Sequence, residues 1–213
     1  MTEASVVIPA QRRAPNSGTA DQGSSPKDII FAEATRLFGA YGYNGTSIRD
    51  IAKAVGILPG SLYTHISNKG ALLLEIIESG VDRFNAAVDR LDQTDLAPDI
   101  KIRDAIREHL MIVAENPQRT LVVFHQWRFL SEPERDRLRD KRARYAEFYI
   151  RTLRAGIDSG IFTPELDCKV ATFTILGTLN WTPEWLSPDG PDTPAHLADQ
   201  ISEHLLRGLL TRH

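Results

Sequence analysis

The segment from residue 46 to residue 72 constrains the fold of this chain most strongly. Apolar residues recur at three- and four-residue spacing in its first third, and Gly56 follows at once. A glycine directly after such a pattern is typical of a helix end, and Pro59 suits the first turn of the next helix. The segment therefore predicts two short helices joined by a tight turn, a helix-turn-helix over residues 47–66.

The second short helix carries small and hydrogen-bonding side chains on its outer face. Leu62 and Ile66 lie four residues apart and are predicted to point inward, which leaves most of 59–65 facing outward. The second helix of such a motif enters the major groove of DNA. We therefore expect double-stranded DNA as a partner. The candidate DNA-binding residues are Thr46, Ser47, Arg49, Pro59, Gly60, Ser61, Tyr63, Thr64, His65 and Lys69.

These candidates divide by chemistry into phosphate and base contacts. Gly60 allows the backbone to approach the groove closely. Asn68 is a good helix cap, and the helix that begins at Lys69 offers a cation and free N–H groups to a phosphate. Phosphate contacts are expected from Tyr63, Lys69 and either Thr46 or Ser47, and base contacts from Ser61, Thr64 and His65.

This part of the chain resembles the N-terminal domain of the TetR family of transcriptional repressors, over about residues 26–80. The resemblance implies a three-helix DNA-binding head. Leu58 and Pro59 replace a pair that is usually polar in the family, which affects the operator sequence rather than DNA binding itself. The matching residues are Phe38-Gly39-Ala40-Tyr41-Gly42-Tyr43, Thr46-Ser47, Ile48-Arg49-Asp50-Ile51-Ala52, Gly56, Gly60-Ser61-Leu62-Tyr63, Lys69 and Ala71-Leu72.

The charge of the chain is unevenly distributed. The net charge is −3, yet seven Lys or Arg and five Asp or Glu residues up to Leu72 give that part +2 and leave −5 for the rest. A mildly basic head on an acidic body favours approach to DNA by one end. Few cations per subunit predict moderate affinity that depends on dimerisation.

Composition excludes several other classes. No run of about eighteen apolar residues is present, so we expect no membrane partner, and without a signal pattern we expect a cytoplasmic protein. The single cysteine, Cys168, has no internal disulfide partner, and the six histidines lack ligand spacing. We expect neither a metal site nor a cofactor.

The whole chain predicts an all-α fold of about nine helices. Residues 1–24 lack apolar periodicity and predict a disordered tail. We expect the head over residues 25–84 and an effector-binding and dimerisation domain over residues 85–213. The predicted helices run from about 26 to 42, 48 to 55, 59 to 65, 69 to 91, 99 to 115, 119 to 130, 133 to 159, 166 to 185 and 194 to 210.

The last two predicted helices carry apolar faces suited to a partner. By resemblance, TetR-like proteins pair through these helices into a four-helix bundle, whose two-fold symmetry matches a palindromic operator. We expect a homodimer, with a purely internal core as the alternative. The faces comprise Val170, Phe173, Thr174, Gly177 and Trp181 in one helix and Ile201, Leu205, Leu206 and Leu209 in the other.

Aromatic residues gather in the middle of the chain with a few polar neighbours. This composition suits an apolar pocket for a small-molecule effector, although an aromatic stripe is also typical of plain core. A cationic series at helical spacing, which includes Arg139, Arg142 and Arg144, predicts a solvated face paired with acids. The candidate ligand-binding residues are Phe84, Val88, Phe124, Trp127, Arg128, Tyr145, Phe148 and Trp181.

The final third carries a narrower resemblance. Residues 156–162 and 180–190 are similar to the C-terminal domain of TetR regulators of fatty-acid, steroid and aromatic-acid breakdown. The resemblance implies a ligand-released repressor with an acyl-CoA or a related catabolite as effector.

Two alternatives from other classes remain open at this point. One is a helical small-molecule enzyme, which the chain supports poorly because it shows no paired carboxylates, nucleophile constellation or phosphate loop. We therefore expect no catalytic residues. The other is a DNA-binding protein that responds to no ligand.

Overall fold

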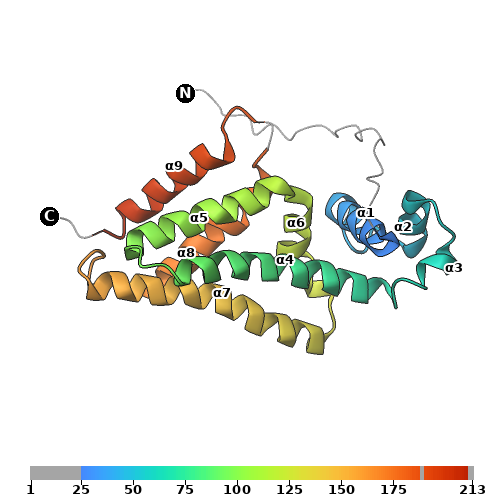
Figure 1. The fold of residues 1–213 in the computed structure, drawn as a ribbon, viewed down its shortest axis with the longest axis horizontal. Coiled ribbons are helices and arrows are strands. Elements are labelled where there is room, and N and C mark those ends of the chain that lie inside the picture. The colour runs from blue at the N-terminus through green and yellow to red at the C-terminus, as the bar shows by residue number, and fades with distance from the viewer. Residues whose placement is uncertain (1–24, 188–189, 211–213) are drawn as a thin grey trace, which may run out of the picture.

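The computed structural model describes residues 25–187 and 190–210, so the predicted tail over 1–24 lies outside the described residues. Within these ranges the chain is all-helical, with nine α-helices, two short 3-10 helices and no strand (Figure 1). None of these helices is both long and apolar enough to cross a bilayer. The α-helices are α1 (Pro26–Tyr41), α2 (Ile48–Val55), α3 (Pro59–Leu62), α4 (Lys69–Asp92), α5 (Pro98–Glu115), α6 (Pro117–His125), α7 (Glu132–Asp158), α8 (Cys168–Asn180) and α9 (Pro194–Arg207); the 3-10 helices are η1 (Trp127–Phe129) and η2 (Thr182–Glu184).

The helix α2 begins and ends where its sequence predicts. The Ser47 hydroxyl accepts a hydrogen bond from the Asp50 N–H at 3.2 Å, and the Asp50 carboxylate accepts one from the Ser47 N–H at 2.8 Å. This reciprocal cap satisfies N–H groups that have no partner inside the helix. Gly56 ends the helix at φ 78°, a left-handed conformation that glycine adopts without a steric cost.

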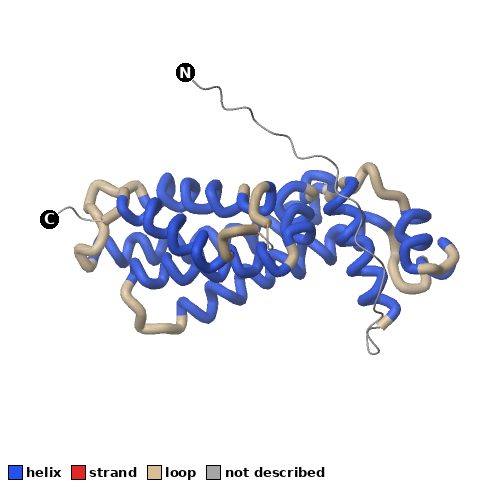
Figure 2. The backbone as a smooth tube through the Cα atoms, turned by 90° about the horizontal axis from the view of Figure 1, so that it is seen from above, coloured by secondary structure: helices blue, strands red, loops and turns tan. Residues whose placement is uncertain are grey.

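The molecule is elongated, with the head (α1 to α3) at one end and the body at the other (Figures 1 and 2). The helix α4 runs out of the head and along the body, where it packs on α5, α6 and α7 (Figure 1). At 1.5 Å per residue its 24 residues span about 36 Å. Residue 84, the predicted domain boundary, therefore falls inside a continuous helix.

The core of the head continues into the body. One buried cluster contains Phe38 of α1, Leu62 of α3, Ile76 of α4 and also Val122 of α6 and Leu138 of α7. The helix α6 stands between the head and the rest of the body (Figure 1). Because this core is shared, a movement of α6 would change the packing of the head.

A close approach between α4 and α6 depends on a glycine. A Cβ at position 80 would lie 2.3 Å from Cγ2 of Val123, so any larger residue at this point would displace the Val123 side chain or move the two helices apart. Gly80 is buried in α4. The glycine thus fixes α6 tightly against the long helix.

Four predicted helices end at least three residues earlier than expected, among them α9, which ends at Arg207 rather than at residue 210. The α-helix α3 ends at Leu62, and residues 63–65 continue as hydrogen-bonded turns. The predicted helix 119–130 breaks after His125 into the 3-10 helix η1, and the predicted helix 166–185 breaks after Asn180, close before Pro183. Proline lacks the N–H that a continuing α-helix needs, which explains the second break.

Candidate DNA-reading head and effector cavity

The outer surface of α3 and its following turn is fully available to a partner. Pro59, Gly60, Ser61, Thr64 and His65 are exposed. The ring of Tyr63 is 55% exposed and the side chain of Leu58, just before the helix, is 76% exposed. The Thr64 hydroxyl donates to the Ser61 carbonyl at 2.7 Å, which leaves its oxygen free to accept.

Thr46 does not belong to this surface. Its side chain is only 2% exposed, and its hydroxyl lies 3.0 Å from the Gly42 carbonyl and 3.2 Å from the Leu37 carbonyl. These bonds tie the loop before α2 to the end of α1. The prediction of a phosphate contact is therefore corrected for Thr46, and Ser47, which is exposed at the start of α2, remains the candidate.

Lys69 is turned toward the protein rather than directly outward. Its ammonium donates to the Tyr43 carbonyl at 3.0 Å and to the Thr46 carbonyl at 2.9 Å, and it lies 4.1 Å from the centre of the Tyr43 ring. An ammonium has three donors, so one remains for a phosphate. The first role of Lys69 in this structure is to hold the loop between α1 and α2.

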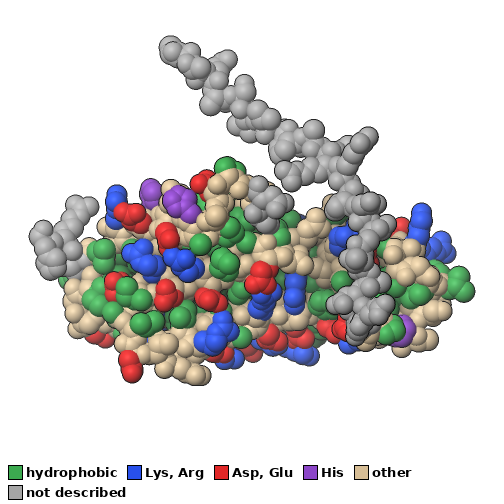
Figure 3. Space-filling model, turned by 45° about the horizontal axis from the view of Figure 1, so that its top comes forward, with side chains coloured by type: hydrophobic (Ala, Val, Ile, Leu, Met, Phe, Trp, Pro, Cys, Tyr) green, Lys and Arg blue, Asp and Glu red, His purple; other side chains and the backbone are tan. Residues whose placement is uncertain are grey.

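Two cations of the head have no acidic partner among the described residues. Lys27 pairs with Glu75 and Arg36 pairs with Glu33, whereas Arg49 and Lys53 of α2 are exposed without an ion pair. On the body, basic and acidic side chains lie intermixed, while apolar side chains reach the surface at the tip of the head (Figure 3). The unpaired cations thus lie on the helix that precedes the reading helix.

Tyr43 connects the head to α6. Its N–H donates to the side-chain oxygen of Gln126 at 3.1 Å, and its ring stacks on Phe129 with ring centres 5.5 Å apart. The ring of Phe38 in α1 also lies against that of Tyr43, with ring centres 5.4 Å apart. Burial and the nearby Glu134 raise the pKa of Tyr43, so the phenol stays neutral. This connection could not be predicted from local patterns, because its partners lie far apart in the sequence.

The body contains a cavity of about 80 Å³ between α4, α6, α7 and α8. Its walls are mostly apolar and aromatic, and Arg142, Tyr145 and Asn180 are the lining residues that carry polar groups. Such a surface accepts a small apolar group and orients it through few hydrogen bonds. The lining residues are Val81, Phe84, Val123, Phe124, Arg142, Tyr145, Leu176 and Asn180.

A buried polar series supports one wall of this cavity. The Tyr145 hydroxyl lies 3.0 Å from Nδ1 of His109 and 3.2 Å from the Tyr149 hydroxyl. Burial lowers the pKa of His109 to about 3 and raises the pKa values of both tyrosines. All three groups are therefore neutral near pH 7, and they fix the ring of Tyr145 in the cavity wall.

Arg142 differs from the other arginines of α7. Burial lowers the pKa of its guanidinium, no acid pairs with it among the described residues, and it stacks over Trp127 at 5.2 Å from the ring centre. By contrast, Arg139 pairs with Asp136 and Arg144 with Asp89. The predicted solvated face is thus wrong for Arg142, which instead brings an uncompensated positive charge to the cavity.

The structure brings together three of the eight predicted ligand-binding residues. Phe84, Phe124 and Tyr145 line the cavity. Val88 and Phe148 are corrected to core positions, because both are buried in the apolar cluster of the body. Trp127, Arg128 and Trp181 are exposed outside the cavity. Five further lining residues were not predicted, because only the tertiary packing brings them to one cavity: Val81, Val123, Arg142, Leu176 and Asn180.

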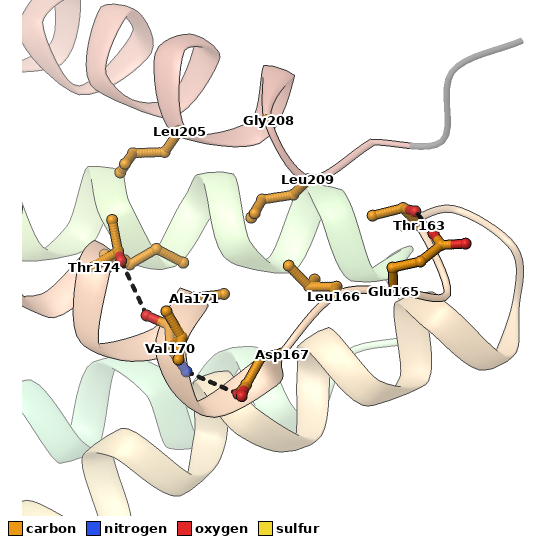
Figure 4. A pocket seen from close by; sticks show the side chains of 11 residues that line it. Thr163, Glu165, Leu166, Asp167, Val170, Ala171, Thr174, Leu205, Gly208 and Leu209 are labelled. Atoms are coloured by element: carbon orange, nitrogen blue, oxygen red, sulfur yellow. Dashed lines mark hydrogen bonds between the residues drawn. The ribbon is translucent and has the colours of Figure 1, made fainter.

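The helices α8 and α9 expose an apolar face. Phe173 and Trp181 of α8 are 57% and 59% exposed, and Val170 is exposed on the same side. Between the two helices lies a groove of about 350 Å³, where Leu205 of α9 and Leu209, in the turn after α9, point toward α8 (Figure 4). Exposed apolar side chains that gather on one face are typical of an interaction surface.

An exposed reading helix, joined through one long helix and α6 to a body with an aromatic cavity, defines a DNA-binding regulator that responds to a ligand. Residues 30–76 match the bacterial regulatory proteins of the tetR family, and residues 95–209 match the tetracyclin repressor-like C-terminal domain. The chain belongs to the TetR family of transcriptional regulators.

Individual relatives share this architecture over nearly their whole length. The chain is 24% identical over 192 residues to the HTH-type transcriptional repressor KstR2 of Mycolicibacterium smegmatis, covering 90% of this chain and 94% of the relative. It is 31% identical to the TetR family regulator PfmR from Thermus thermophilus, with a TM-score of 0.78 and coverage of 86% and 99%. It is 26% identical to AibR in complex with isovaleryl coenzyme A and operator DNA, with a TM-score of 0.76 and coverage of 87% and 98%.

Proposed function

We propose that this protein is a homodimeric repressor that binds a palindromic operator without ligand and is released by a short-chain acyl-CoA. In this proposal residues 25–84, which comprise the head and the first part of α4, read DNA. The effector site combines Val81 and Phe84 of α4 with residues from the rest of the chain, which also binds the second protomer. The turn-flanked helix α3 enters the major groove, with base contacts from Ser61, Thr64 and His65 and phosphate contacts from Ser47, Arg49, Tyr63 and Lys69.

The unpaired guanidinium of Arg142 in an aromatic cavity is the observation that carries the effector assignment. Arg142 is half-buried, and a partly desolvated cation without an acid favours a ligand that brings a carbonyl oxygen or a negative charge. The cavity volume of about 80 Å³ equals on the order of three water molecules at about 30 Å³ each, which suits an acyl group of few carbons. The bulky nucleotide part of a CoA thioester would lie outside this cavity. AibR, a structural relative, is known in complex with isovaleryl coenzyme A.

The route from the cavity to the head follows α6. Phe124 lines the cavity, and Gln126 and Phe129, two and five residues further on, hold Tyr43 of the head. An acyl group that displaces Phe124 would shift this segment and, through Tyr43 and Lys69, the loop that positions α2. A ligand achieves release only if it binds the shifted state more tightly than the DNA-bound state.

The exposed face of α8 and α9 supports the homodimer. In a symmetric dimer the same apolar patch on each protomer covers its copy. The exposed Gly177 leaves room on this face for close helix approach, because a Cβ there would meet no atom within 4 Å. Two reading helices held by this interface would meet half-sites about one turn of DNA apart.

The experiment combines operator selection with ligand-induced release. The full-length protein is used to select duplexes from a random DNA library, and the selected operator is then titrated with acetyl-, isovaleryl-, hexanoyl- and palmitoyl-CoA and with free CoA. We expect the short and branched thioesters to raise the melting temperature and release the DNA, since a ligand at about 100 times its Kd adds about 2.7 kcal/mol to stability. Failure of every thioester to do either would refute the effector, and failure to enrich any sequence would refute the DNA-binding proposal.

A further inference from the structure

Leu58 occupies a position where the fold itself favours a polar residue. It is the residue before α3, and its carbonyl accepts from the N–H groups of Ser61 at 3.0 Å and Leu62 at 3.3 Å. Ser, Thr, Asp or Asn at such a position would cap a free N–H of the helix, whereas the leucine side chain makes no cap. The sequence thus gives up a stabilising interaction that the neighbouring helix α2 has at Ser47.

The leucine gains nothing from packing in exchange. Its side chain is 76% exposed, the highest value among the exposed large apolar residues of the described chain. The residue before it, Ile57, is half-buried against the core of the head, so the chain direction at this point turns Leu58 outward. A residue that breaks a local rule without a structural compensation marks a functional position.

We propose that Leu58 is a specificity-determining residue that contacts the 5-methyl group of a thymine in the operator. This inference rests on the proposed DNA-binding function. The N-terminal end of a reading helix is the part that meets base edges. In the major groove the thymine methyl is the apolar group that a base pair presents, and apolar side chains pair with it. Gly60, exposed two residues later with no atom within 4 Å of its Cβ position, leaves the space for this close approach.

The test replaces single thymines of the selected operator half-site by uracil, which removes only the 5-methyl group. Binding is measured for the wild-type protein, for Leu58→Ser and for Leu96→Ser, a control at an exposed leucine of the loop between α4 and α5. We expect uracil at one position to weaken wild-type and Leu96→Ser binding about fourfold, the effect of losing one buried methyl group. Leu58→Ser should bind thymine and uracil operators equally, and its melting temperature should equal or exceed that of the wild type because serine restores the cap.

The outcomes separate this inference from the function on which it rests. Enrichment of an operator, followed by no uracil effect at any position, overturns the role of Leu58 and leaves the regulator intact. A uracil effect of equal size in the wild type and in Leu58→Ser assigns the methyl contact to another residue and also overturns it. Only the absence of any selected operator refutes DNA binding itself.

Discussion

The ammonium nitrogen of Lys69 lies 2.9 Å from the carbonyl oxygen of Thr46, across the base of the reading motif. Through this bond and a second one to the Tyr43 carbonyl, the first residue of α4 holds the loop that leads into α2. The side chain of Thr46 holds the same loop to α1 from within. The start of α2, against which the reading helix α3 packs, is therefore held by α1 and α4 together.

Replacement of Lys69 by methionine removes both bonds while keeping most of the side-chain length. Because hydrogen bonds to charged groups are the stronger ones, we expect Lys69→Met to lower the free energy of unfolding by about 1–3 kcal/mol and to weaken operator binding. Lys53→Met, at an exposed cation of α2, should weaken DNA binding and leave the unfolding curve unchanged. Urea denaturation and gel shift measure the two effects. An unchanged unfolding curve for Lys69→Met would contradict the stabilising role of the two Lys69 hydrogen bonds.

Substitution of Gly60 should change protein stability and DNA binding in opposite directions. A Cβ at this position meets no atom within 4 Å, so Gly60→Ala is free of clashes inside the protein and should raise stability by roughly 0.5–1 kcal/mol through helix propensity. The added methyl group would stand between α3 and the groove, and we expect operator affinity to fall at least tenfold. Thermal melting and fluorescence anisotropy with labelled operator check both signs. Equal affinity of the alanine variant would show that the backbone does not approach DNA at this residue.

Phe173→Glu tests the exposed face of α8. A charge introduced into an apolar interface is desolvated without a partner, so we expect the dimer to dissociate and operator binding to fall more than tenfold. Phe173 is exposed in the single chain, so the protomer itself should remain folded. Sedimentation velocity reads the mass, and Met111→Glu, at an exposed residue of α5, serves as the matched control. A dimeric Phe173→Glu protein would place the interface elsewhere.

Arg142→Met retains the volume of the side chain and removes its charge. Since burial disfavours the charged guanidinium, we expect the melting temperature to stay equal or rise. Operator binding without ligand should persist, and release by the short acyl-CoA should require a much higher concentration. The neighbouring variant Arg139→Met, which loses only an exposed pair with Asp136, should respond as the wild type. Release of both variants at the same concentration would remove Arg142 from the effector site.

His109 should make stability depend on pH. Burial lowers its pKa from 6.5 to about 3, so the unfolded chain binds the proton more readily than the folded chain. The contribution of neutral His109 to the free energy of unfolding is thus fully present above pH 6.5. It is lost as the pH falls toward 3, by about 1.4 kcal/mol per pH unit. Urea denaturation at about pH 7, 6 and 5, which covers the upper part of this loss, should show a flatter dependence of the unfolding free energy on pH for His109→Gln. Equal slopes in the wild type and in His109→Gln would contradict the assignment.

Local signals were sufficient to predict the head. Ser47 starts α2 as its cap, and Gly56 ends it in a left-handed conformation. Both effects act within a few positions of the chain, so the local sequence predicts them. The apolar spacing of the long helices likewise predicted an all-helical fold. These features depend on neighbours in sequence, which a pattern contains.

Features that depend on distant partners were not predictable in this way. The break after α6 coincides with the bond between Gln126 and Tyr43, and the burial of Arg142 follows from the packing of four helices around the cavity. The sequence predicted Thr46 as a hydroxyl at a helix start, although in the structure its hydroxyl donates to the Gly42 carbonyl inside the loop. In each case the spacing within one helix was compatible with two environments, and the tertiary structure selects between them.

The apolar cluster that joins Phe38 and Ile76 to Val122 and Leu138 limits how this regulator could be re-engineered. A chimera that grafted residues 25–84 onto the body of another family member would expose half of a shared interior on each side of the seam. A chimera that combines this operator preference with another effector-binding body would therefore have to include α6 and the first turns of α7 together with the head.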